Sequence, residues 1–134
     1  DHADNFGNVW HPEVSDRQLH GRVVTLPCGT RIAGLGGVFR GAVWYPKDAQ
    51  APKFRNREAH ASVTPRQDRW QGSVHLKHWS SIYPDEVEQL AAQQADVLIT
   101  HEAPGYHEHG FKALDDLARR PAALPPRFVP FSAA

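Results

Sequence analysis

The sequence predicts an α/β fold, and three patterns in its second half carry that prediction. An amphipathic helix is expected from Pro84, a short buried strand at residues 96–100, and a second amphipathic helix from Phe111 to Arg120. Helix, buried strand, loop and helix in succession are typical of layered α/β domains. The chain has 134 residues, which is the length of about one domain.

Two short runs rich in β-branched residues precede those elements. Residues 22–26 and 31–35 flank the turn Pro27-Cys28-Gly29-Thr30, and this arrangement predicts a β-hairpin. Cys28 has no charged pair beside it in sequence, so we expect it to be structural rather than nucleophilic. Residues 1–21 are polar and show no regular period.

A long irregular excursion is expected at residues 47–79. From Lys47 to Lys77 the sequence holds seven basic and three acidic residues, and prolines interrupt any helix. Such a segment buries little apolar area. Its aromatic and histidine residues superficially resemble a nucleic-acid surface, but the neutral chain favours a solvated loop.

The first helix is predicted by Pro84 at its start, acidic residues in its first turn, and Val87, Leu90 and Ala91 on one face. The continuous apolar run 97–99 favours a strand covered on both faces. The second helix ends at Arg119-Arg120-Pro121. Beyond a domain of residues 1–120, residues 121–134 are expected to be a Pro/Ala-rich tail in which only 127–129 have the composition of a strand.

Composition excludes several classes of protein. Lysine and arginine number 15 and aspartate and glutamate 15, which excludes a strongly basic nucleic-acid binder and an acidic solvating tail. No run approaches the ~18 apolar residues of a membrane span, and no apolar stretch follows a basic start, so no signal peptide is expected within these 134 residues. The single cysteine excludes a disulfide scaffold. We expect a cytoplasmic protein without a membrane partner, and the absence of methionine indicates a processed chain or a fragment.

The loop from Thr100 to Gly110 contains the strongest candidates for chemistry. His101 directly follows the buried strand, and ligands bind at the carboxyl ends of strands in open α/β sheets. We therefore assign His101 a functional role and expect His107 and His109 to be solvated, or at most substitute ligands. The helix-breaking Pro104 and Gly105 exclude a zincin motif. The glycines of Gly34-Leu35-Gly36-Gly37 match no phosphate-binding loop, and we interpret them as a tightly packed bend.

Four runs, taken together, resemble bacterial metallophosphoesterases of the calcineurin-like superfamily. The resemblance extends from residue 1 to about residue 118 and is most specific in the blocks at 34–39 and 101–104. The runs are Leu19-His20-Gly21-Arg22-Val23-Val24, Ile32-Ala33-Gly34-Leu35-Gly36-Gly37-Val38-Phe39-Arg40-Gly41, Trp44-Tyr45-Pro46, and Ala95-Asp96-Val97-Leu98-Ile99-Thr100-His101-Glu102-Ala103-Pro104.

The resemblance implies a sandwich with a mixed sheet flanked by helices, and hydrolysis of phosphoesters at two divalent metal ions (manganese, iron or zinc). By resemblance, Asp1 and His101 are metal ligands, and His2 is the catalytic acid or phosphate contact. The Asp-x-His, Gly-Asp and Gly-His-x-His motifs of the family are absent from this sequence. The resemblance therefore implies a partial domain that lacks both ends of the motif set.

Two hypotheses follow for the function. The first is a metal-dependent phosphoester hydrolase domain, incomplete in this chain, with nucleic acid expected only as a substrate. The alternative is a non-catalytic α/β fragment or pseudo-enzyme that acts as an interaction module.

Overall fold

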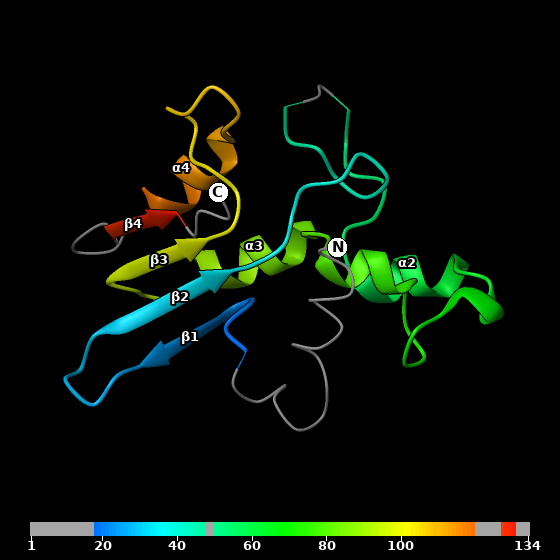
Figure 1. Cartoon of the computed structure of the whole chain (residues 1–134), viewed down its shortest axis with the longest axis horizontal. Helices are drawn as coiled ribbons and strands as arrows, with labels where there is room; N and C mark the ends of the chain where they lie inside the picture. The colour runs from blue at the N-terminus through cyan, green and yellow to red at the C-terminus, as the bar shows by residue number, and fades with distance from the viewer. Residues whose placement is uncertain (1–17, 48–49, 120–126, 131–134) are drawn as a thin grey trace.

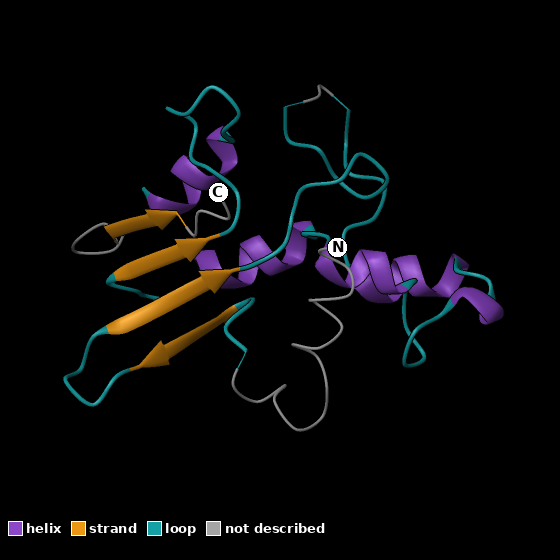
Figure 2. Ribbon diagram, in the orientation of Figure 1, coloured by secondary structure: helices purple, strands orange, loops and turns teal. Residues whose placement is uncertain are grey.

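A mixed four-stranded sheet organises the chain, in the order β1-β2-β3-β4 (Figures 1 and 2). The computed structural model describes residues 18–47, 50–119 and 127–130, the last of these by backbone alone. Strands β1 (Arg22–Thr25) and β2 (Arg31–Leu35) are antiparallel. Strands β3 (Val97–Thr100) and β4 (Arg127–Pro130) continue the sheet in parallel with β2. The carboxyl ends of β2, β3 and β4 consequently meet at one edge.

Helices α3 (Pro84–Ala91) and α4 (Lys112–Ala118) pack on the sheet through one hydrophobic core. Apolar side chains of β2, β3 and both helices form it, because alternate residues of each strand point to the same face. Its fully or almost fully buried members are Ala33, Leu35, Phe39, Ile82, Leu90, Ala95, Leu98, Phe111, Leu114 and Leu117. This core fixes the orientation of the strand ends.

The predicted α/β class is confirmed, together with most of its elements. The hairpin forms as β1 and β2, the two helices begin close to the expected residues, and β3 lies between β2 and β4. Strand β4 pairs with β3 and includes residues 127–129, the part of the expected tail that has the composition of a strand. Every helix in the described ranges is too short or too polar to cross a bilayer.

One expectation about β3 is wrong for the residues that the structure describes. The apolar run predicted a strand covered on both faces, but burial alternates along it. Leu98 and Thr100 face the helices and are buried, whereas Val97 and Ile99 are only partly buried. The described helices α3 and α4 share one core, and so cover a single face of the sheet.

The segment 54–81, here called the polar lobe, differs from the irregular excursion that we expected. It contains helix α2 (Arg57–Val63) and two 3-10 turns, η1 (Arg66–Asp68) and η2 (Leu76–Ser80). It extends from the sheet to the right of Figure 1. The N-cap side chain of α2 satisfies a backbone donor, because Asn56 Oδ1 accepts a hydrogen bond from Ala59 N at 2.7 Å.

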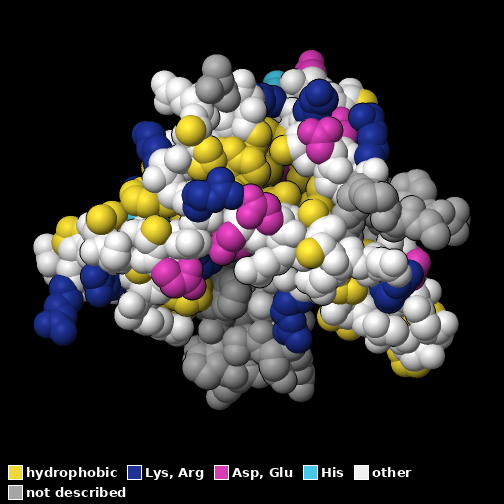
Figure 3. Space-filling model, turned by 180° about the vertical axis from the view of Figure 1, so that it is seen from behind, with side chains coloured by type: hydrophobic (Ala, Val, Ile, Leu, Met, Phe, Trp, Pro, Cys, Tyr) yellow, Lys and Arg dark blue, Asp and Glu magenta, His cyan; other side chains and the backbone are white. Residues whose placement is uncertain are grey.

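The polar lobe has few buried aliphatic side chains. Among its described residues, Val74 is the aliphatic side chain that is fully buried. Rings supply most of its packing. Trp70 and Trp79 meet edge to face at 5.1 Å, and Phe54 stacks on His60 at 4.1 Å. Seen from behind, the molecule shows acidic and basic side chains side by side across its middle, with hydrophobic side chains above them (Figure 3).

Candidate functional site

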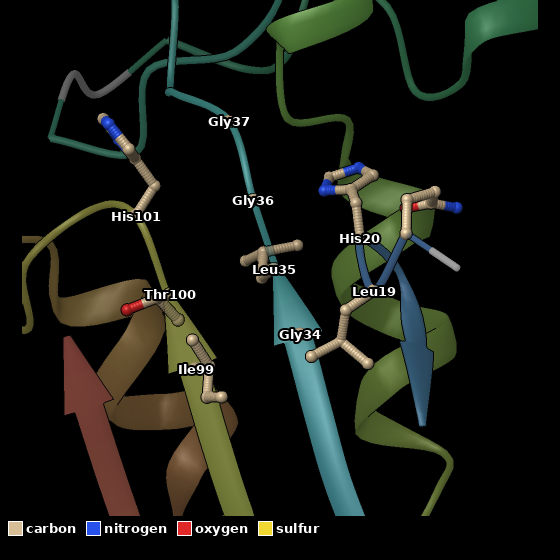
Figure 4. Close-up of a pocket in the computed structure, with 10 residues that line it drawn as sticks. Leu19, His20, Gly34, Leu35, Gly36, Gly37, Ile99, Thr100 and His101 are labelled. Carbon is tan, nitrogen blue, oxygen red and sulfur yellow. The ribbon is translucent and has the colours of Figure 1, made fainter. Parts of the chain in front are cut away.

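A cavity of about 280 Å³ lies at the carboxyl ends of β2 and β3 (Figure 4). Three segments line it: the residues before β1, the glycine turn after β2, and the end of β3. They contribute Gln18, Leu19, His20, Gly34, Leu35, Gly36, Gly37, Ile99, Thr100 and His101. This is the position at which parallel strands present ligand sites, because their loops diverge there. The cavity is apolar at its floor and has an imidazole at either side.

The glycine turn of the cavity is shaped by close packing, as the sequence predicted. A Cβ atom on Gly34 would overlap the side chain of Leu19. Gly37 has a φ of 93°, and a Cβ there would lie 2.5 Å from the carbonyl oxygen of Ser80. Only glycine combines that backbone conformation with such a close approach. The turn therefore brings the polar lobe against the cavity through Ser80.

His101 occupies the predicted position, directly after β3, and both of its ring nitrogens are buried. Its backbone amide donates to the carbonyl oxygen of Leu35 at 3.3 Å, which joins the ends of β2 and β3. The neighbouring Glu102 accepts a hydrogen bond from Phe39 N at 3.0 Å, and its carbonyl oxygen accepts one from the hydroxyl of Thr100. These contacts hold the loop after β3 against the turn after β2.

His20 stands across the Gly34–Gly37 segment from His101 (Figure 4). Its Nε2 lies 2.8 Å from Glu86 Oε2, and the other carboxylate oxygen accepts from Arg57 Nε at 2.9 Å. Burial would raise the pKa of Glu86, but the hydrogen bond and charge of His20 and the charge of Arg57 together lower it. Glu86 is therefore an ionised link between the cavity wall and the polar lobe.

Arg57 ties the end of the polar lobe to α2. Its guanidinium donates to the carbonyl oxygens of His78, Trp79 and Ser81 at 2.8 to 3.2 Å. It also lies 4.8 Å from the ring centre of Tyr83, and burial raises the pKa of this phenol. The hydroxyl of Tyr83 is 2.7 Å from His60 Nδ1. This contact links α2 to the residue that precedes α3.

The other site residues predicted from the sequence are placed as follows. Asp1 and His2 lie outside the described residues. His107 and His109 are exposed on the loop after β3, with ring centres 5.8 Å apart, and neither lines the cavity. His109 pairs with the adjacent Glu108 at 3.1 Å. The structure thus places His101 alone, among the predicted site residues that it describes, at the cavity.

The described residues do not form a metal centre by themselves. No three histidine, cysteine, aspartate or glutamate side chains in the described part of the chain are grouped as metal ligands would be. A pair of divalent ions needs several anionic or imidazole donors. The described cavity offers the imidazole of His101, while that of His20 is engaged with Glu86.

Sequence reasoning missed the His20–Glu86–Arg57 group. His20 and Glu86 are separated by 66 residues, and Arg57 and Glu86 by 29. Local patterns carry no signal for such pairings. The one available sign was the acidic first turn of α3, which the sequence explained by the helix dipole alone.

Comparison with other proteins finds a longer protein that is similar to this chain. The chain is similar to an uncharacterized protein of Haemophilus influenzae, with 47% identity over 115 residues. The match covers 86% of this chain and 50% of that protein, so the chain spans about half the length of the relative. No protein-family model matches the chain, and no solved structure matches it.

Proposed function

We propose that the chain is part of a metallophosphoesterase domain of the calcineurin-like superfamily, which hydrolyses phosphoesters with divalent metal ions. His101 supplies one imidazole ligand. Asp1 is the second ligand that this chain would supply, and His2 is the catalytic acid or phosphate contact; both lie outside the described residues. The proposal includes the fold of that superfamily, a sandwich with a mixed sheet flanked by helices.

The position of His101 carries the proposal. A histidine directly after a central parallel strand, on a cavity, lies where α/β enzymes hold reacting groups. The glycine turn after β2 keeps this region free of bulky side chains. The length of the Haemophilus relative also supports it, because that protein has as much sequence again in which further ligands can lie.

Metal ions, when bound, would supply an activated water and stabilise charge on the phosphoryl group. The described residues would orient one ligand and shape the pocket. Glu102 and Leu35 hold the His101 backbone in place through the contacts described above. His20 and Glu86 fix the opposite wall.

Manganese binding to this chain tests the role of His101. Paramagnetic Mn²⁺ is expected to broaden the NMR signals of residues near His101, Gly36 and Gly37, with weak affinity because most donors are missing. His101→Ala should abolish that broadening, and His109→Ala, which changes an exposed histidine of the same loop, should leave it intact. Broadening centred on His107 and His109 instead would contradict the assignment.

Hydrolysis of a chromogenic phosphodiester with added Mn²⁺ tests the activity. We expect turnover by the full-length Haemophilus relative and little or none by this chain. Absence of metal-dependent turnover in the relative would favour the non-catalytic alternative. Robust turnover by this chain, lost in His101→Ala, would instead show that it builds a complete site.

A further inference from the structure

A second cavity, of about 250 Å³, lies in the polar lobe and shares no lining residue with the cavity at the ends of β2 and β3. Helix α2 and the turns η1 and η2, at the right of Figure 1, contribute to its wall. Its charged and aromatic lining residues are Phe54, His60, Asp68, His75, Lys77 and His78. Asp68, His75 and Lys77 are exposed, so a solute reaches the cavity directly from water.

Two of the imidazoles in this second cavity are held through Nδ1 by buried hydroxyl groups. The hydroxyl of Tyr83 lies 2.7 Å from His60 Nδ1, and that of Ser81 lies 3.0 Å from His78 Nδ1. Tyr83 and Ser81 are fully buried, and neither hydroxyl has another acceptor among the described residues. A buried hydroxyl that donates to nothing destabilises the folded protein, so we assign each hydroxyl as the donor and each Nδ1 as the acceptor.

The third imidazole, that of His75, is held in the same way by the backbone. Its Nδ1 accepts a hydrogen bond from Lys77 N at 3.2 Å. A neutral imidazole that accepts at one nitrogen carries its proton on the other. All three histidines of the second cavity therefore carry the proton on Nε2. The Nε2 atoms of His60 and His78 are not among the described atoms that are buried without a partner, so these N–H groups are open to the cavity.

Positive charge surrounds the imidazoles of the second cavity. Burial lowers the pKa of His60 and of His78, and positive charges, that of Lys77 among them, lower both pKa values further. The ammonium of Lys77 forms no ion pair with a carboxylate of the described residues. Asp68 is a carboxylate on the rim, but it is exposed, and water and salt screen its charge. The cavity thus favours an anion over a cation.

The same proton positions disfavour a metal ion. A nitrogen that carries a proton has no lone pair for a metal. This agrees with the finding that the described residues form no group of three metal ligands. The three Nε2–H groups are instead hydrogen-bond donors directed to one space, beside an ammonium that can supply the charge.

We propose that the second cavity binds an oxyanion, the phosphate or carboxylate group of a small molecule, through the Nε2–H groups of His60, His75 and His78 and the ammonium of Lys77. Hydrogen bonds from neutral and charged N–H donors to an ionised oxygen are short and strong. The ring of Phe54, which stacks on His60 with 4.1 Å between ring centres, offers an apolar surface to the rest of such a molecule. This site needs no metal and is independent of the proposed function.

The proton positions are tested first, by ¹⁵N NMR of the histidine side chains at pH 7. Protonated and unprotonated ring nitrogens have distinct signals, and we expect Nε2–H in His60, His75 and His78. Tyr83→Phe removes the donor to His60 Nδ1, so His60 should then populate both neutral forms and bind the anion more weakly. Unchanged amide signals of β2 and β3 confirm that the variant is folded. A proton on Nδ1 of His60 or His78 in the unmodified chain would overturn the proposal.

Binding is tested with inorganic phosphate and with acetate, each titrated into this chain at constant ionic strength. We expect saturable shifts of the ring signals of His60, His75 and His78 and none at His109, which is exposed on the loop after β3. The pKa of His60 and of His78 should rise on saturation, because the anion offsets the positive charge of Lys77. The tighter of the two probes identifies the kind of oxyanion that the site serves.

Three variants separate a built site from general attraction of charge. Lys77→Gln should weaken binding of the tighter probe about tenfold, as expected for loss of a charge-assisted hydrogen bond. Lys112→Gln, which removes an exposed lysine of α4, is the matched control and should bind like the unmodified chain. Asp68→Asn should strengthen binding about twofold, because it removes a carboxylate from the rim.

Linear shifts that chloride reproduces at equal ionic strength would show an adventitious ion only and overturn the proposal. Equal weakening by Lys77→Gln and Lys112→Gln would also overturn it, because attraction would then depend on net charge alone. Saturable Zn²⁺ binding at the Nε2 atoms of His60 and His78 would replace the oxyanion site by a metal site. None of these outcomes touches His101, so the Mn²⁺ experiment tests the proposed function separately.

Discussion

The sheet with its two helices and the polar lobe are stabilised by different physical means. In the sheet region, apolar side chains of β2, β3, α3, α4 and the adjoining loops, Phe39 and Phe111 among them, form one continuous core. In the polar lobe, aromatic rings, imidazoles and the hydrogen bonds of Arg57 take the place of such a core. The first region depends on removal of apolar area from water, and the second on directional contacts that are satisfied only when the fold is complete.

This difference explains where sequence patterns succeed. A hydrophobic core leaves a period in the sequence, whereas a hydrogen-bond network leaves none. It also predicts that the two regions respond differently to pH and to substitution. The Gly37–Ser80 contact joins them at the cavity, so damage to the lobe is expected to reach the site.

The largest effect is expected from Leu98→Ala in the sheet. Leu98 is 2% exposed in the central strand and belongs to the core. The substitution should lower the free energy of unfolding by about 2–5 kcal/mol, through lost burial and a cavity. Chemical denaturation followed by circular dichroism measures it. A loss within experimental error would show that the sheet does not depend on this core.

Acid should selectively destabilise the polar lobe. His78 is buried 4.6 Å from the ring of His60, and its pKa falls to about 4, from burial first and then from His60, Lys77, Arg40 and His75. Because the folded pKa lies below that of the unfolded chain, the unfolded state binds more protons. The neutral His78 therefore contributes to the free energy of unfolding fully above about pH 6.5. This contribution, roughly 3 kcal/mol, is lost as the pH falls toward 4.

Stability curves at pH 7 and pH 4.5, with hydrogen exchange in α2 and β3, measure this effect. His78→Gln should flatten the pH dependence in that window, while His109→Gln, on the exposed loop, should not change it. Equal acceleration of exchange in α2 and β3 would mean that the two regions unfold as one unit. It would contradict the view that acid destabilises the polar lobe selectively.

Arg57→Ala should cost about 2 kcal/mol, because carbonyl oxygens and the Glu86 carboxylate lose their donor. Exchange should accelerate in residues 57–81 more than in β2 and β3. Arg57→Lys is the matched control for charge, and it should recover only part of the stability because the planar fork is lost. Full rescue by lysine would show that charge alone holds the lobe.

The smallest effect is expected from Val63→Ala at the end of α2. Val63 is 65% exposed, so truncation should change the free energy of unfolding by no more than about 0.5 kcal/mol. A larger loss, measured in the same denaturation experiment, would reveal apolar packing in the polar lobe that its exposure does not indicate.

The fold was more predictable than the candidate site. The hairpin, α3, β3 and α4 each have a local pattern of apolar spacing, turn residues or helix-start residues, and all form. His101 was found because it directly follows such a strand. His20, Glu86, Arg57 and Arg40 were not, because their contacts connect segments far apart in sequence. Helix α2 was also missed, since its order comes from Asn56 capping and the bonds of Arg57 rather than from an apolar face.

The sequence by itself determined the α/β class, the hairpin, the central strand and the histidine that follows it. Each is a consequence of side-chain periodicity and of the backbone preferences of proline and glycine, which act over a few residues. Only the tertiary structure decided that Glu86 links His20 to Arg57, that Ser80 packs on Gly37, and that Arg40 donates to Ser80. The reason is physical: hydrogen bonds and ion pairs depend on which segments meet in space, and that is settled by the packing of the whole chain.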